Sequence, residues 1–174
     1  MDESVSGWWR ANALAVGAIA LLVPALIVTI SWNERSGVDA NRGDHPITLD
    51  AGASTSYAGA TVGPAAAEFT DLPLAPQDSR VVTVTIRIEP GSPAFGCTAP
   101  LLRETTGAQR QWNATDDLGR EWDPEVHTFC DPDDTTPYEL ELDYLVPADA
   151  SGPFAVELVS ATGLPEFVRA VVEP

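Results

Sequence analysis

The sequence predicts a mainly β domain, an antiparallel β-sandwich, that follows a single transmembrane helix. Three observations lead to this prediction. A long apolar run near the N-terminus carries no charge, the rest of the chain is punctuated by proline, and apolar residues there recur at every second position. The first observation indicates a membrane span. The other two indicate strands with one wet face, because helices tolerate proline poorly and strand side chains alternate between faces.

The apolar run covers residues 11–32. At helical rise it spans about 30 Å, the thickness of the hydrocarbon core of a bilayer. Trp8 and Trp9 precede the run and Trp32 ends it, as in the aromatic belts of membrane helices. A cleaved signal peptide is the alternative, but its apolar region is usually about 7–15 residues long and a cleavage site follows closely. We expect an uncleaved signal anchor, with residues 1–10 as a short cytoplasmic tail.

The chain after the anchor divides into a polar segment and one domain. Residues 33–46 are rich in Gly, Asn and Asp, which predicts a stalk without regular structure. Residues 47–174 are numerous enough to bury a core, and we expect them to form the extracytoplasmic domain. Period-two alternation is clearest in four predicted strands: Arg80–Glu89, Tyr138–Tyr144, Phe154–Leu158 and Glu166–Val172. Weaker strands are predicted at His45–Leu49, Ser54–Val62, Leu101–Thr105 and Gln109–Ala114.

Seven or eight strands in a domain of this size favour an immunoglobulin-like β-sandwich, with an up-and-down barrel as the alternative. The segment Thr105–Ala108 reads as the turn of a hairpin, and Pro147 should end its strand because proline cannot donate to a ladder. Phe167–Val172 is apolar on both faces, which suits a central strand or an edge that a partner extends by strand addition.

Cys97 and Cys130 are the only cysteines. In an exported domain such a pair predicts a disulfide, which restricts the unfolded chain. One alternative is a metal site built on His127 and Cys130, but such sites usually need three or four ligands, and the other histidine, His45, lies in the predicted stalk. Free thiols are the remaining alternative. We expect the disulfide and no metal centre.

The chain is strongly acidic, with a formal net charge of −17 and no lysine. This charge argues against nucleic acid and against anionic lipid headgroups as partners. Carboxylates cluster in two predicted loops, at Asp116 and Asp117 and at Asp131, Asp133 and Asp134. Such loops could hold Ca²⁺, which takes six to eight oxygen ligands, although neither follows the calcium-loop pattern. Solvated turns are the simpler interpretation, and cation binding remains open as the alternative function.

The sequence contains no motif of a known catalytic site. It has no nucleophile elbow, zinc-protease helix, phosphate-binding loop or dinucleotide fingerprint. His127 is the only histidine inside the predicted domain that could serve a catalytic triad. We expect no enzymatic activity and no cofactor. Trp112 and Trp122 are expected to pack in the core or over the disulfide, and either would be a candidate partner contact if it were exposed.

Two segments resemble a known family. Leu101–Gly107 followed by Arg110–Trp112 resembles the hairpin of telokin-like, immunoglobulin-like bacterial envelope domains, and Leu142–Pro147 is similar to a later strand end of the same domains. Glu104 stands where that family has Asp. Many proteins of high-GC Gram-positive bacteria combine a short tail, one helix and such a domain. The resemblance implies a fold and an envelope location, and it transfers no catalytic residues.

Together these observations predict a single-pass cell-membrane protein that is bound to the bilayer through residues 11–32. Its acidic β-sandwich is expected to be a non-enzymatic interaction module with a protein partner in the membrane or envelope, such as an accessory subunit of an envelope or transporter complex. A stand-alone domain that binds a ligand or Ca²⁺ is the alternative.

Overall fold

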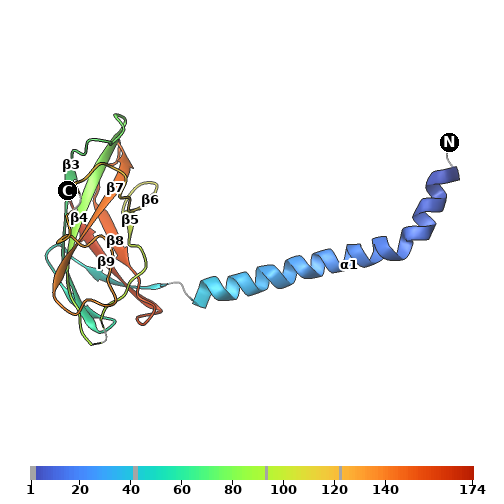
Figure 1. Ribbon diagram of the computed structural model, residues 1–174, viewed down its shortest axis with the longest axis horizontal. Coiled ribbons are helices and arrows are strands. Elements are labelled where there is room, and N and C mark those ends of the chain that lie inside the picture. The colour runs from blue at the N-terminus through green and yellow to red at the C-terminus, as the bar shows by residue number, and fades with distance from the viewer. Residues whose placement is uncertain (1–2, 41–42, 93, 122) are drawn as a thin grey trace. The chain divides into compact units, whose positions relative to one another are not determined.

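The computed structural model describes residues 3–40, 43–92, 94–121 and 123–174. The chain forms two compact units that divide between residues 42 and 43. The first contains one helix and the second contains nine strands in the described residues (Figure 1). Each unit is described by itself below.

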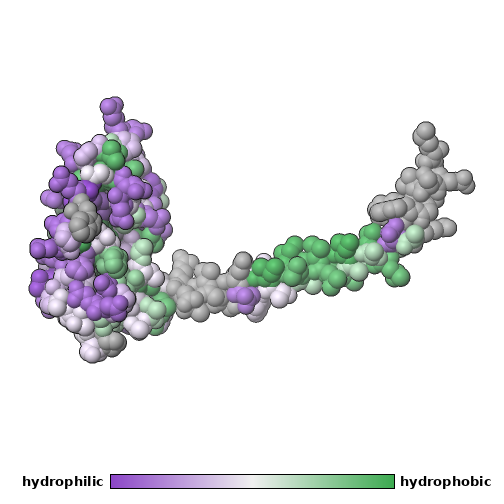
Figure 2. All heavy atoms as spheres, in the orientation of Figure 1, coloured by the Kyte–Doolittle hydropathy of each residue, from purple (hydrophilic) through white to green (hydrophobic). Residues whose placement is uncertain are grey.

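The helix α1 extends from Glu3 to Ala40. Within it, Ala11–Asn33 is long and apolar enough to cross a membrane, and none of this span is buried in the structure. Its apolar side chains, such as Leu14 at 91% exposure and Leu21 at 76%, face outward and form the apolar band in Figure 2. Residues 33–40 continue the helix and His45 begins a strand, so the predicted irregular stalk at 33–46 is wrong for most of its length.

The second unit is built from two β-sheets. One sheet has the strand order β1-β9-β8-β5-β6 and the other has the order β2-β3-β4-β7. The strands are β1 (His45–Leu49), β2 (Thr55–Tyr57), β3 (Ala60–Thr70), β4 (Ser79–Glu89), β5 (Leu101–Glu104), β6 (Gln111–Asn113), β7 (Tyr138–Pro147), β8 (Phe154–Leu158) and β9 (Glu166–Val172). We call the first sheet the five-stranded sheet and the second the four-stranded sheet. All strand pairs are antiparallel except β1 and β9, which are parallel.

The core fills the space between the sheets. Every second residue of β4 is fully buried there, and the facing residues of β7 and β8 complete the layer: Val82, Val84, Ile86, Ile88, Leu140, Leu142, Tyr144, Phe154, Val156 and Leu158. The alternation predicted for β4 and β7 is therefore confirmed, but their predicted wet face is wrong at Val81, Thr83 and Asp143, which are also buried. In β8, however, all five residues are buried, so the predicted wet face of that strand is wrong.

One other strand prediction is wrong, and one alternative left open by the sequence is decided. Ser54–Val62 is not one strand but β2, a turn and the start of β3. Ala58 and Gly59 both have positive φ, 49° and 82°, as a two-residue type I′ hairpin turn requires. In addition, β9 pairs with β1 on one side and β8 on the other, so the alternative of an open edge at Phe167–Val172 is wrong and the central position is confirmed.

Candidate functional site

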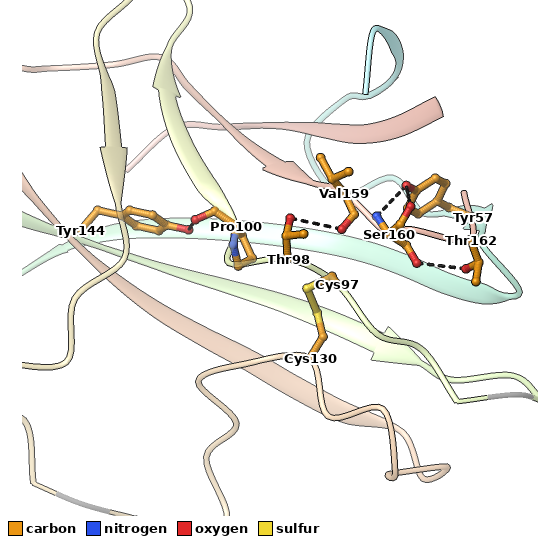
Figure 3. The surroundings of a disulfide bond; sticks show 9 residues. All are labelled: Tyr57, Cys97, Thr98, Pro100, Cys130, Tyr144, Val159, Ser160 and Thr162. Atoms are coloured by element: carbon orange, nitrogen blue, oxygen red, sulfur yellow. Dashed lines mark hydrogen bonds between the residues drawn. A yellow bond between two sulfur atoms is a disulfide. The ribbon is translucent and has the colours of Figure 1, made fainter. Parts of the chain in front are cut away.

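The predicted disulfide between Cys97 and Cys130 is present, with a Cα–Cα distance of 5.4 Å. Cys97 lies in the segment between β4 and β5, and Cys130 lies in the long loop between β6 and β7 (Figure 3). Cys130 is only 5% exposed and both residues pack against the core. Because both sulfur atoms are in the disulfide, Cys130 cannot join His127 as a thiolate ligand, and the metal and free-thiol alternatives do not hold.

Hydrogen bonds fix the chain on both sides of the disulfide. The Thr98 amide donates to the carbonyl of Val159 at 2.9 Å, and the Thr98 hydroxyl donates to the same oxygen at 3.3 Å (Figure 3). The Tyr144 hydroxyl donates to the carbonyl of Pro100 at 3.2 Å. The segment that carries Cys97 is thereby attached both to the end of β8 and to the core side of β7. The disulfide therefore belongs to the structural framework of the domain.

Tyr57, at the end of β2, links the two sheets. Its hydroxyl accepts from the Ser160 amide at 2.9 Å and donates to the carbonyl of Glu166 at 2.9 Å. Ser160 and Glu166 lie at the two ends of the loop between β8 and β9. The ring approaches Gly163 so closely that a Cβ atom there would lie 2.4 Å from a ring carbon. No local sequence pattern indicates this anchor, because the partners of Tyr57 are about a hundred residues away.

The predicted cation-binding carboxylates are used in turns. Asp131 accepts from the Asp133 amide at 2.9 Å, and Asp134 accepts from the Thr136 amide at 2.8 Å. The Thr136 hydroxyl donates to Asp134 as well, and the two bonds from Thr136 are the main reason that the pKa of Asp134 lies below its ordinary value. Asp116 and Asp117 are exposed. In the described part of the chain, no three His, Cys, Asp or Glu side chains gather closely enough to hold a metal ion.

His127 stacks on Tyr138, with ring centroids 4.4 Å apart, and its Nε2 lies 3.2 Å from Asp134 Oδ2. The other ring nitrogen of His127 and the hydroxyl of Tyr138 are buried without a hydrogen-bond partner among the described residues. Burial, together with the nearby charge of Asp134, raises the pKa of Tyr138 to about 12. None of these contacts includes a serine or cysteine nucleophile.

Of the two tryptophans singled out in the sequence, Trp112 lies among the described residues and packs against the core. Trp112 on β6 is half-buried and meets the ring of Phe154 edge to face, with centroids 6.0 Å apart. It packs against the core, as the structural interpretation expects. Trp122 lies outside the described residues, so the prediction of a partner contact there stays a prediction.

Arg120 fixes the loop between β6 and β7 on the outer face of the four-stranded sheet. Its guanidinium donates to both carboxylate oxygens of Asp143, at 2.6 and 2.7 Å, and lies 2.6 Å from Glu141. Thr83, beside Asp143 in the register of β4 and β7, donates to the same carboxylate at 2.6 Å. The loop buries Leu118 as well, and its carbonyl accepts from the Leu74 amide. The outer side of β4 is therefore covered at Val81 and Thr83, whereas Arg87 and Glu89 stay exposed.

A second buried carboxylate lies on the five-stranded sheet. Glu157 on β8 is 7% exposed and accepts from Arg103 at 2.9 Å and from Arg169 at 2.7 Å. The two arginines come from the neighbouring strands β5 and β9. Sequence reasoning assigned these charges to a solvated face, because nothing in the local pattern says that arginines of two other strands will meet one glutamate.

Among the described residues, the edge of β3 from Ala65 to Thr70 is a six-residue stretch that no strand pairs with on its outer side. The short β2 pairs with β3 only as far as Val62, and beyond a bulge between Val62 and Ala65 the strand pairs with β4 alone. A groove of about 400 Å³ lies beside this edge, between β3 and the end of β9. It is lined by Asp50, Ala51, Ala65, Ala66, Ala67, Val171, Val172 and Glu173.

A second hollow of about 500 Å³ lies at the β3–β4 loop. There the guanidinium of Arg80 lies over the ring of Phe69. This arginine is therefore engaged by an aromatic face of its own domain.

The chain was compared with family models, with curated proteins and with solved structures. None of them matches it.

Proposed function

We propose that the chain is a single-pass cell-membrane protein whose β domain lies outside the cytoplasm and acts as a non-enzymatic interaction module. The observation that carries the proposal is the span Ala11–Asn33, an apolar helix with no part buried, joined to a β domain that has a closed core of its own. Exposed leucines along the whole span need an apolar environment, which a bilayer supplies.

The disulfide supports the placement of the domain. Cys97 and Cys130 are joined, and such bonds persist in oxidising compartments outside the cytoplasm. With the domain outside, residues 1–10 form the cytoplasmic tail. The negative charge keeps such a domain soluble and away from anionic headgroups: residues 41–174 carry 22 carboxylates and 7 arginines, a net charge of −15.

The strand order supports an immunoglobulin-like assignment. In that fold one sheet contains strands A, B and E and the other contains C, F and G. Here β3, β4 and β7 are neighbours in one sheet, and β5, β8 and β9 are neighbours in the other. The strands follow one another along the chain in the corresponding order, with β6 in the place of C′. Domains of this kind commonly serve recognition, so an accessory subunit of an envelope or transporter complex is the role we propose.

Two measurements on the full chain in its native membranes test the proposal. Alkaline carbonate should leave the protein in the membrane, and protease added to intact cells should digest the β domain. Replacement of Leu22 by arginine should weaken membrane integration, because arginine at the centre of a span costs about 2.5–3.5 kcal/mol. Extraction of the unchanged chain by carbonate, or protection of its domain in intact cells, would contradict the proposal.

Crosslinking in the same membranes, followed by purification and mass spectrometry, tests the partner. We expect a second membrane or envelope protein in stoichiometric amount. Recovery of the chain alone would contradict the accessory-subunit role, even if the topology were as proposed.

A further inference from the structure

We propose that the open edge of β3, Ala65–Thr70, binds an extended basic segment of a partner protein, which adds to the four-stranded sheet as a fifth strand. This inference rests on the proposed function and names the site and the chemistry of the partner. Extended peptides commonly bind exposed sheet edges in this way: main-chain hydrogen bonds provide affinity, and pockets for alternate side chains provide specificity.

The backbone of this edge is available for pairing. From Ala65 to Thr70 each residue is in register with β4, from Ile86 to Val81. In an antiparallel ladder every second residue directs its N–H and C=O to the other side. Among the described residues no strand or loop backbone accepts from or donates to those groups. The segment is therefore a straight edge with unused donors and acceptors.

The other sheet edges are occupied or short. β7 is bridged by Ala114 and by His127, whose carbonyl accepts from the Glu141 amide at 2.8 Å. β6 has only three residues, and β1 contains Pro46. Native proteins commonly protect an edge with lysine, proline or a bulge. In β3 the proline and the bulge come before Ala65, and the open segment that follows carries neither a lysine nor an arginine.

The groove beside the edge selects the side chains of the added strand. Three alanines, Ala65–Ala67, form one wall, so little side-chain volume fills the space. The opposite wall is Val171 and Val172, which extend past the end of β1 because Leu49 pairs with Ala170. The volume of about 400 Å³ leaves room for apolar side chains of moderate size at alternate positions of a bound peptide.

The negative charges around the groove favour a basic partner segment. Asp50 and Glu173 line it and both are exposed, and no cation lines it among the described residues. Glu68 is exposed on the open edge itself. A second copy of the chain fits poorly, because pairing two such edges would bring these carboxylates and two domains of net charge −15 together. Lysine or arginine at the positions that alternate with the apolar ones would be attracted instead.

The test uses the full chain in nanodiscs of neutral phosphatidylcholine, so that a cationic probe has no anionic lipid to bind. The probe is a blocked peptide of alternating lysine and valine, about ten residues long, which suffices for a strand of ordinary length. We expect it to bind and to slow hydrogen exchange at residues 65–70 while exchange in β7, at the opposite edge, is unchanged. Protection elsewhere, or no binding, would overturn the proposal.

A second peptide separates strand addition from simple charge attraction. It has the same sequence with every backbone nitrogen methylated, so it keeps its lysines but has no N–H to donate. Strand addition predicts that its affinity falls by roughly tenfold or more, since several hydrogen bonds are lost. Equal affinity of the two peptides would show attraction by the acidic surface alone and would overturn the proposal.

Two double variants test whether the carboxylates at the groove attract the basic peptide. Asp50→Asn with Glu173→Gln removes two charges at the groove, and Glu125→Gln with Asp133→Asn removes two exposed charges from the β6–β7 loop, which borders the opposite edge. The groove variant should bind the lysine–valine peptide several-fold more weakly than the control variant. Equal weakening of peptide binding in the two variants would show that the groove carboxylates have no special role. Sedimentation of the free protein as a dimer with residues 65–70 already protected would assign the edge to a second copy instead.

Failure here is distinguishable from failure of the proposed function. If crosslinking in native membranes recovers a partner and an Ala66→Lys variant, which places a lysine on the open edge, recovers it equally, the interaction module stands and the site falls. If no partner is recovered by either chain, the proposed function falls.

Discussion

At the scale of single residues, two buried tyrosines of similar exposure should contribute very differently to stability. Tyr57→Phe removes a hydroxyl that both accepts and donates, and it leaves the Ser160 amide without its acceptor. We expect a loss of about 1–3 kcal/mol in the free energy of unfolding, measured by urea denaturation of the full chain in detergent. Tyr138→Phe is the control, because its hydroxyl is buried without a partner in the described structure. An equal loss in the two variants would contradict the assignment.

Two tyrosines of the core, Tyr138 and Tyr144, predict an alkaline limit to stability. Burial raises the pKa of Tyr138 to about 12, and burial also raises the pKa of Tyr144 above its ordinary value. A group whose pKa is raised on folding binds its proton more tightly in the native state, so its contribution is complete below the unfolded pKa of about 10 and is lost as the pH rises toward the folded value. Urea midpoints should therefore fall between pH 10 and 12. Tyr138→Phe should make that fall shallower, and an unchanged slope would count against this cause.

At the scale of elements, one side chain holds the long β6–β7 loop in place. Arg120→Gln leaves the carboxylate of Asp143, which is 9% exposed, without its bidentate partner. We expect a loss of about 2–3 kcal/mol and faster proteolysis within the loop. Arg87→Gln is the matched control, since Arg87 and Glu89 are both exposed and such a pair contributes about 0–1 kcal/mol. Proteolysis of the Arg120 variant as slow as that of the control would show that the other contacts of the loop, such as Leu118 and the disulfide, fix it without Arg120.

The disulfide ties the same loop to the segment before β5. Its cysteines are 33 residues apart, and closing a loop of that length in the unfolded chain corresponds to about 3–4 kcal/mol. Cys97→Ser with Cys130→Ser should lower the urea midpoint accordingly. A reductant should lower the midpoint of the unchanged chain to the same value and leave that of the double variant unaltered. A reductant effect in the variant would point to some other target.

The elements with strong local signals were predictable, and those defined by distant partners were not. The apolar helix, the alternating strands β4 and β7 and the cysteine pair could be read from residues close together in the sequence. The β2–β3 hairpin was missed because its turn is Ala58-Gly59, whereas Asn-Gly is the stronger signal for that turn type. The helical continuation over residues 33–40 was missed because their polar composition favours a linker.

The candidate site was predicted less well, for the same physical reason. The acidic loops could be found in the sequence, but whether their carboxylates converge depends on turn geometry. Asp143 and Glu157 looked like solvent-facing strand residues, and their burial depends on arginines from other elements. The open edge of β3 follows from strand order, which no local pattern encodes.

At the scale of the whole domain, the two sides of the sandwich differ. On the β6 and β7 side, the bridge between Ala114 and Tyr144 joins the sheets, and the disulfide-bonded loop adds to that side. On the opposite side, β1 and β2 are the terminal strands, and the groove lies between the end of β9 and the part of β3 beyond its pairing with β2. The disulfide-bonded loop and the bridge therefore lie on one side, whereas the proposed strand addition would use the unpaired backbone of β3 on the other.

Because β1 and β9 pair in parallel, the force needed to unfold the domain should depend on the direction of pulling. β1 is the first strand after the helix, so a pull from the membrane reaches the domain through it. If the opposing pull acts at the end of β9, all five register pairs from His45 to Leu49 are loaded in shear at once. Single-molecule pulling between residues 43 and 174 should thus need more force than pulling between Ala60 and Glu89, where the β3–β4 hairpin opens one pair at a time. In the proposed topology, this pairing would let the domain bear tension between the bilayer and a bound partner.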